Sequence, residues 1–267
     1  MGGDHALLLD AVREAGALAM SYFGRDFESW EKSPGHPVCD ADLAVNDLLE
    51  RALRVPRPAH GWLSEESDDD PSRLDAERVW IIDPIDGTRA FLAGRPEFTV
   101  CAALAVAGAP AAAAVFNPAT GELFDALAGG GARLNGRRIQ ASGARTLAGA
   151  RLLVGSTEMH RAGWPAELAE ANVTAISSMA YKLALVAAGR FDAAVTLWPK
   201  SEWDVVAGDL LVREAGGRLT DAAGRGLEYN LARPRFGSVV AAASRLHPCL
   251  IERLSPLIGR SANLGQT

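Results

Sequence analysis

The sequence has few of the residues that disulfide, zinc or nucleic-acid binding requires. Its three cysteines are widely spaced and odd in number, and none belongs to a C-x-x-C pair. Neither a disulfide framework nor a thiolate zinc site is therefore expected. Basic residues are not in excess, because 27 lysines and arginines stand against 33 acidic residues and give a formal net charge of -6. A nucleic-acid-binding or membrane-surface protein would favour a basic face, so this balance argues against both partners.

Neither a signal peptide nor an uninterrupted membrane-spanning segment is expected. The N-terminal stretch has Asp10 and Arg13 within its apolar pattern, which is typical of an amphipathic helix rather than a signal peptide. Residues 98–116 carry no charge and reach the length of a spanning helix, but an interior Gly-Ala-Pro sequence interrupts them. We interpret them as two buried hairpin strands and expect a cytoplasmic protein.

The apolar pattern predicts a mixed α/β protein. The chain has 267 residues, of which 48% are hydrophobic, enough for one large domain or two closely packed lobes. We predict an N-terminal α+β lobe with the metal and phosphate motifs over residues 1–140 and a C-terminal α/β lobe with the substrate-side residues over 141–267, packed as one compact unit. Helices are predicted at about residues 5–24, 42–54 and 162–171 and in SMAYKLALVAAG and WDVVAGDLLVREAGG, and strands in GWLS, RVWII, FTVCAALAV, AAAAVFNP, GELFDALAGGG, RLLVGST, VTAIS and DAAVTL.

Carboxylates follow one buried strand in an unusual pattern. In IIDPIDGTRAF the chain is expected to leave the strand at Asp83, turn at Pro84 and enter a helical turn that Asp86 caps. The N–H groups of Gly87 and Thr88 would then be available to a phosphate. Because carboxylates repel phosphate, both aspartates suit this place if they hold hard cations such as Mg²⁺. Taken alone, the motif is also compatible with an ordinary strand-end turn.

Two further carboxylates have the same local setting. Glu65 follows the apolar strand GWLS, and Asp204 opens a helix after a third strand. Asp68, Asp69 and Asp70, by contrast, precede a proline in a predicted loop and are expected to be solvated. Three separated carboxylate positions at element ends predict convergence on one metal site.

Here the residues resemble a known family. WLSEES, WIIDPIDGTRAF and WDVVAGDLLVREAGG together resemble the motifs of the inositol monophosphatase superfamily, whose members are Mg²⁺-dependent, lithium-sensitive phosphatases. The resemblance extends over nearly the whole chain. It implies a layered αβαβα sandwich, usually a homodimer, that acts on a small phosphorylated substrate with two or three Mg²⁺ ions.

The resemblance also implies residue roles. Thr88 with Glu65 would orient the attacking water, and Gly87 with Thr88 would contact the phosphate. No covalent nucleophile is needed, since metal-activated water attacks in line. The implied metal ligands are Glu65, Asp83, the carbonyl of Ile85, Asp86 and Asp204.

An early segment, EKSPGHPVCDADLAV, resembles the family's Lys…Asp segment. It places Lys32 near the site and makes Asp42 a further catalytic residue, beside Thr88 or a third metal. Two positions depart from the family's common pattern, because Cys39 replaces a threonine and Ser64 replaces a glycine. We expect the change at Cys39 to alter local packing more than chemistry.

Substrate choice depends on positions outside the metal motifs. Inositol monophosphatases commonly have an acidic residue seven positions before the WD aspartate, and here that position is Leu197. Lys182 falls where the CysQ-type 3′(2′),5′-bisphosphate nucleotidase branch often has a lysine, which could pair with a second phosphate. The alternative is a snorkelling surface lysine on an amphipathic helix. DGTRAFLAGRPEFTV and YNLARPRFGSVVAA also resemble that branch.

We therefore expect hydrolysis of 3′-phosphoadenosine 5′-phosphate to AMP and phosphate. Inositol 1-phosphate is the second candidate, and histidinol phosphate and a fructose bisphosphate are further alternatives. The predicted substrate contacts are Lys182, Asp204 and Lys32. A hypothesis of another class is a catalytically silent phosphate-binding regulator, which would predict loss of Glu65 or Thr88, and both are present.

Overall fold

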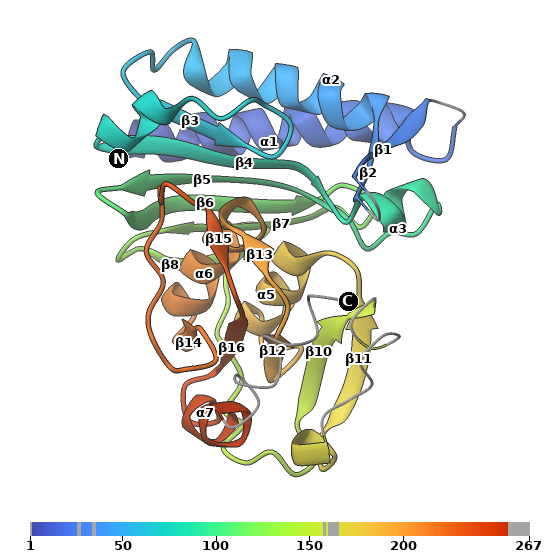
Figure 1. Cartoon of the computed structure of the whole chain (residues 1–267), viewed down its shortest axis with the longest axis vertical. Helices are drawn as coiled ribbons and strands as arrows, with labels where there is room; N and C mark the ends of the chain where they lie inside the picture. Colours follow the sequence, from blue (N-terminus) through green and yellow to red (C-terminus); the bar gives the residue numbers. More distant parts are fainter. Residues whose placement is uncertain (1, 26–27, 34–35, 157–158, 160–165, 256–267) are drawn as a thin grey trace.

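The computed structural model describes residues 2–25, 28–33, 36–156, 159 and 166–255. Five layers follow one another, as Figure 1 shows from top to bottom: helices α1 and α2, a seven-stranded sheet, helices α5 and α6, a five-stranded sheet, and helix α7. The predicted layered αβαβα sandwich is confirmed. The helices are α1 Gly2–Tyr22, α2 Asp40–Leu49, α3 Thr88–Leu92, α5 Met179–Ala187, α6 Glu202–Glu214 and α7 His247–Leu254.

The strands form two large sheets and two short ribbons. The seven-stranded sheet contains β3 Gly61–Ser64, β4 Arg78–Asp86, β5 Thr99–Val106, β6 Ala109–Asn117, β7 Glu122–Leu127, β8 Gly131–Leu134 and β9 Arg137–Arg138, in that order. The five-stranded sheet has the order β11 Asn172–Ile176, β10 Arg151–Gly155, β12 Ala193–Thr196, β16 Val239–Ala243 and β14 Gly217–Thr220. The ribbons pair β1 Ser29–Ser33 with β2 His36–Cys39, and β13 Lys200–Ser201 with β15 Arg235–Phe236.

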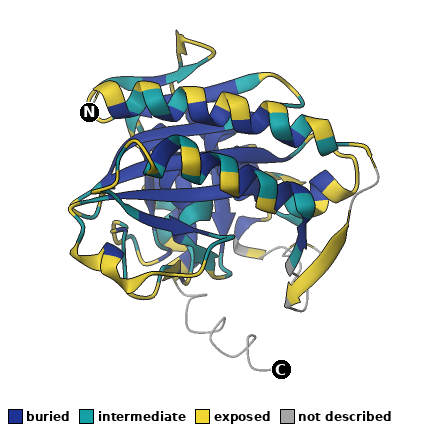
Figure 2. Cartoon of the chain, turned by 90° about the horizontal axis from the view of Figure 1, so that it is seen from above, coloured by how far each residue is buried: buried dark blue, intermediate teal, exposed yellow. Residues whose placement is uncertain are grey.

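The seven-stranded sheet is buried on both faces. In β4, Val79 and Ile81 belong to the core that contains α5 and α6, whereas Trp80 and Ile82 belong to the core under α1 and α2. Figure 2 shows these two helices from above, with buried inner faces and exposed outer ones. Covering both faces requires strands that are apolar throughout. This requirement explains the uncharged residues 98–116, which form β5 and β6 as predicted.

Among the described residues, no helix combines the length and apolar character that crossing a membrane requires. The expected cytoplasmic location stays a prediction.

The two halves of the chain share one core. The strands of the first sheet end at residue 138, and those of the second begin at residue 151. A single apolar cluster nevertheless includes Ile81 and Ala103 from the first half together with Leu183 and Ala241 from the second. The division into lobes at residue 140 stays a prediction, because shared packing does not tell whether either half folds alone.

Some element boundaries differ from the predicted ones. Helix α2 begins at Asp40 and ends at Leu49, and a π-helical turn over Glu50–Arg54 completes the predicted segment. A 3₁₀ helix, Pro71–Asp75, precedes β4. The helix predicted near 162–171 lies partly outside the described residues, and within them a 3₁₀ turn spans Ala166–Leu168.

Helices α5 and α6 cross closely at Gly208. A Cβ atom there would lie 2.4 Å from Cβ and Cδ1 of Leu183, on α5. The absence of a side chain thus lets α6, which contains Asp204, pack directly on α5.

We expect Gly208→Ala to lower the free energy of unfolding by about 2 kcal/mol, because overpacking outweighs the ~1 kcal/mol gain in helix propensity. Urea unfolding followed by circular dichroism measures it. Gly226→Ala is the control, since Gly226 is exposed and a Cβ atom added there would have no neighbouring atom within 4 Å. An equal loss of stability in both variants would contradict the packing explanation.

Candidate metal and phosphate site

A β-bulge in β4 brings two carboxylates to the same face of the sheet. Asp83 lies opposite Cys101 of β5, and Asp86 lies opposite Thr99, so three steps along β4 match two along β5. In a regular strand, residues three apart point to opposite faces. The extra residue removes this conflict. The expectation that the strand ends at Asp83 is wrong, because β4 continues through Pro84 to Asp86.

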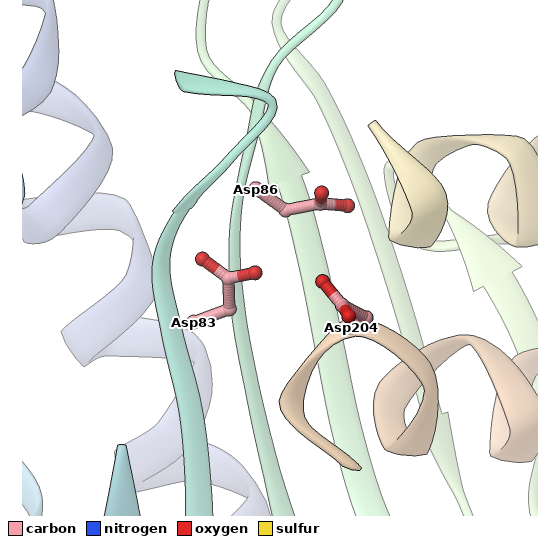
Figure 3. A group of neighbouring side chains, drawn as sticks. All are labelled: Asp83, Asp86 and Asp204. Atoms are coloured by element: carbon pink, nitrogen blue, oxygen red, sulfur yellow. The ribbon is translucent and has the colours of Figure 1, made fainter. Parts of the chain in front are cut away.

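Asp204 approaches the same place from α6. It is the third residue of that helix, where its Oδ2 accepts a 2.8 Å hydrogen bond from the backbone N–H of Ser201. One carboxylate oxygen from each of Asp83, Asp86 and Asp204 lies within 4.8 Å of the others. Figure 3 shows the three side chains directed toward one another from β4 and α6. The structure thus brings together three of the five predicted ligands.

Glu65 lies beside this cluster at the end of β3. Strand β3 runs parallel to β4, with Ser64 opposite Ile82, and the backbone N–H of Glu65 donates to the carbonyl of Ile82 at 3.2 Å. Lys32, from the ribbon β1–β2, has its Nζ 3.4 Å from Oε1 of Glu65 and 2.5 Å from Oε1 of Glu66. The structure therefore places Lys32 beside Glu65 and Glu66, the acidic residues of the WLSEES motif.

Asp42 and Thr88 are in hydrogen-bond contact near the end of β4. The Oγ1 of Thr88 lies 3.4 Å from Oδ1 of Asp42 and donates at 3.1 Å to the carbonyl of Ile85. The Oδ2 of Asp42, which is buried, accepts from the N–H and the thiol of Cys39, both at 2.9 Å. Cys39 therefore supplies a side-chain donor where the family commonly has a threonine.

Asp86 does not cap the short helix α3. Gly87 occupies the cap position with a φ of 100°, and a Cβ there would lie 2.8 Å from the carbonyl oxygen of Glu97, so this position requires glycine. The Oδ2 of Asp86 instead accepts from Oγ of Ser178 at 2.7 Å and from the N–H of Ala180 at 2.5 Å, at the start of α5. Sequence reasoning missed Ser178, although a serine directly before an apolar helix is an N-cap signal.

Sequence reasoning also missed a polar contact between the WLSEES motif and helix α2. The hydroxyl of Ser64 donates to Oδ1 of Asn46 at 2.6 Å, and Nδ2 of Asn46 donates to Oγ of Ser67 at 3.1 Å. Ser64 therefore has a structural role that the family's usual glycine could not have. Asn46 was detectable as a polar residue on the buried side of the predicted helix.

Of the predicted substrate contacts, Lys182 is enclosed by the fold. The side chain of Lys182 is buried, with 1% relative exposure, and its Nζ donates to the carbonyl of Ile176 at 3.2 Å. The interpretation of Lys182 as a snorkelling surface lysine is therefore wrong. Leu197 packs, partly buried, against the core between the five-stranded sheet and α7.

The cluster is electrostatically crowded. Burial, reinforced by the charge of Asp204, raises the pKa of Glu65 from 4.5 to about 8, and burial raises that of Asp86 from 3.8 to about 6. Burial also raises the pKa of Asp83, whose two carboxylate oxygens have no hydrogen-bond partner within the part of the chain that the structure describes. Oxygen donors with this excess of negative charge fit a hard divalent cation such as Mg²⁺.

These shifts predict how the stability of the metal-free protein depends on pH. Between about pH 4.5 and 8, the folded protein binds more protons than the unfolded chain because the pKa of Glu65 is raised to about 8 on folding. The free energy of unfolding therefore falls as pH rises through this range. We expect the urea midpoint in EDTA to fall accordingly, and Mg²⁺ to restore it, since cations take the place of the bound protons. Glu65→Gln should flatten the profile, and a midpoint that rises with pH in EDTA would contradict this account.

Asp83→Asn should raise the thermal midpoint of the EDTA-treated protein and abolish the further rise on adding Mg²⁺. The substitution removes one repelling charge and offers an amide donor to the neighbouring carboxylates. Differential scanning calorimetry measures both effects. Asp209→Asn is the control, because buried Asp209 accepts from Arg213 and Tyr229 and should lose stability while keeping the Mg²⁺ effect. A metal-free Asp83→Asn protein less stable than the parent would contradict the prediction.

The geometry and the motifs agree with a comparison to known families. Residues 5–258 match the inositol monophosphatase family. The chain belongs to the inositol monophosphatase family. The protein is 38% identical over 232 residues to an inositol-1-monophosphatase from Rhizobium meliloti. The alignment covers 82% of this chain and 86% of that relative.

Other relatives of this family member have different names. It is 34% identical over 262 residues to the Nus factor SuhB of Pasteurella multocida, covering 94% of this chain and 96% of that protein. The crystal structure of the extragenic suppressor protein suhB from Bartonella henselae is similar with a TM-score of 0.81 and 31% identity, covering 93% of this chain and 97% of that one. The predicted membership of the superfamily is confirmed, and placement in the CysQ-type branch stays a prediction.

Proposed function

We propose that this protein is a Mg²⁺-dependent phosphatase that hydrolyses small phosphomonoesters. The observation that supports it most is the position of Gly87 and Thr88 directly after the strand whose Asp83 and Asp86 meet Asp204. A cation site and backbone N–H groups for a phosphate thereby occur at one strand end. This combination suits phosphoryl transfer, where charge on the phosphate oxygens must be neutralised.

In this proposal the carboxylates form the cation site. When bound, Mg²⁺ would supply positive charge to the phosphate oxygens and make water more acidic. Lys32 would stay beside the acidic residues and lend its charge to the substrate phosphate. Glu65, Asp83, Asp86, Asp204 and the carbonyl of Ile85 would hold two or three ions.

Thr88 and Glu65 would orient the attacking water. Because the Thr88 hydroxyl is held between the Ile85 carbonyl and the Asp42 carboxylate, its own oxygen can accept a hydrogen bond from the water in a fixed direction. The two donors of Cys39 keep Asp42 in place. No residue needs to form a covalent intermediate.

We propose inositol 1-phosphate as the preferred substrate, ahead of 3′-phosphoadenosine 5′-phosphate. Lys182 is one of the features that favour the bisphosphate, and its Nζ is enclosed at the Ile176 carbonyl. The name of the Rhizobium meliloti relative also supports an inositol phosphate. The bisphosphate remains the second candidate, because Leu197 offers no acidic contact to the sugar hydroxyls.

Phosphate release from the two substrates, compared side by side with and without Mg²⁺, tests the proposal. We expect Mg²⁺-dependent hydrolysis with a higher kcat/KM for inositol 1-phosphate than for the bisphosphate. Asp83→Asn is the control and should be inactive. Histidinol phosphate and a fructose bisphosphate complete the panel. Absence of release from all four would refute the enzyme proposal.

Lys182→Met then tests the role of the buried lysine in substrate choice. We expect the KM values for both substrates to change by the same factor, because an enclosed side chain acts on both through packing. A selective rise in KM for the bisphosphate would reverse our ranking.

A binding role without hydrolysis is the second candidate function. The relative from Pasteurella multocida is named a Nus factor and not a phosphatase, which supports a role of this second kind. Homodimer assembly and inhibition by lithium are further predictions from the family resemblance.

A further inference from the structure

A hydrogen-bond network around buried Arg73 begins in the segment that follows Glu65. Arg73, in the 3₁₀ helix before β4, has 2% relative exposure. Its Nε donates to Oδ1 of Asp69 at 2.6 Å and its Nη2 to Oδ2 at 2.9 Å, a bidentate contact. Asp69 follows Glu65 by four residues, so Arg73 holds the end of the segment that contains Glu65.

The same guanidinium reaches the loop before β15. Nη1 of Arg73 donates to Oδ1 of Asn230 at 2.7 Å, and Nη2 donates to the carbonyl of Leu231 at 3.0 Å. Nδ2 of Asn230 returns a bond to the carbonyl of Arg73 at 2.9 Å. Arg73 therefore joins two segments that lie 157 residues apart in the sequence.

Glu202 connects this loop to α6. It has 0% relative exposure, and its two carboxylate oxygens accept from the N–H groups of Asn230 at 2.7 Å and Leu231 at 2.8 Å. Glu202 is the first residue of α6 and precedes Asp204 by two positions. The network thus runs from the Glu65 segment to the helix turn that contains Asp204.

This connection opposes an electrostatic strain in the site. Glu65 and Asp204 belong to different elements, and each charge raises the energy of the other. When both carboxylates are ionised, as cation binding requires, their repulsion favours separation of the two elements. Hydrogen bonds made through Arg73 and Asn230 keep the elements together without using any oxygen that a cation needs.

We propose that Arg73 and Asn230 are positioning residues of the metal site, which keep Glu65 and Asp204 at a separation that binds divalent cations. This inference rests on the proposed function. It predicts that breaking the network weakens cation binding by more than the accompanying loss of stability explains.

Asn230→Gly is the most specific test of the network. Asn230 has a φ of 62°, in the left-handed region that glycine adopts without strain. The substitution should therefore preserve the backbone conformation and the hydrogen bond from the N–H of residue 230 to Glu202. The substitution removes both side-chain bonds to Arg73. Asn230→Asp is the rescue variant, since aspartate tolerates the same backbone and restores an acceptor for the guanidinium.

The chain offers a matched control in Asn135→Gly. Asn135 has a φ of 49°, and its side chain likewise makes two hydrogen bonds, here both with the main chain: it accepts from the Leu123 N–H at 2.9 Å and donates to the Gly121 carbonyl at 3.0 Å. It lies between β8 and β9, at the opposite edge of the sheet from β3. Each substitution therefore removes two side-chain hydrogen bonds at a left-handed backbone position, one near the site and the other far from it.

Isothermal titration of the EDTA-stripped full-length proteins with Mg²⁺ alone, with thermal unfolding in EDTA alongside, tests the proposal. We expect both glycine variants to unfold at lower temperatures than the parent. Only Asn230→Gly should raise the Kd for Mg²⁺, by on the order of tenfold, as loss of a contact that orients metal ligands typically does. Asn230→Asp should return the Kd toward the parent value.

The outcomes separate this inference from the proposed function. A parent protein that binds no Mg²⁺ would refute the proposed function. Parent-like Mg²⁺ binding by Asn230→Gly would overturn the positioning role and leave the phosphatase proposal standing. Equal weakening by Asn135→Gly and Asn230→Gly would also overturn it, since the effect would then follow from stability alone.

Discussion

Crowding of like charges is the constraint on which the site depends. Three aspartate oxygens lie within 4.8 Å of one another, and Asp83 has no hydrogen-bond partner for either oxygen among the described residues. This cluster lowers the stability of the metal-free folded protein, because buried carboxylates without partners cost free energy. The arrangement persists because β4 is fixed between two apolar cores and α6 is packed into the core between the two large sheets. Stability elsewhere in the fold thus maintains an unfavourable cluster that suits a cation.

Much of the fold and part of the site could be predicted from the sequence. Apolar runs that stop at Glu65 and before Asp204 located two carboxylates, because strand ends and helix starts are local features. The direction of Asp86 could not be predicted in this way. Two-residue periodicity points it away from Asp83, and only the bulge beside Pro84 reverses that direction. Proline within a strand is a sign of a bulge, although the same residue is also typical of a turn.

Other misinterpretations arose from contacts distant in the sequence. The partner of Asp86 is Ser178, 92 residues away, so a local capping rule could not identify it. The sequence left open that Lys182 snorkels on a surface helix, yet every residue of α5 is buried. A helix between two sheets has no solvent-facing side, and a short sequence does not reveal that a second sheet will cover it. Substrate assignments that rest on such a residue therefore change once its surroundings are known.

The order of the layers also bears on how the molecule would come apart. None of the strands in the described residues is shared by the two large sheets, and the layer of α5 and α6 joins them. Asp83 and Asp86 belong to the upper sheet, whereas Asp204 belongs to this helical layer. Cations bound between the upper sheet and the helical layer would thus cross-link the two layers. Removing the cations with a chelator would loosen the contact between these layers before the hydrogen bonds within either sheet break. Metal occupancy would then set the sequence of unfolding events as well as the chemistry.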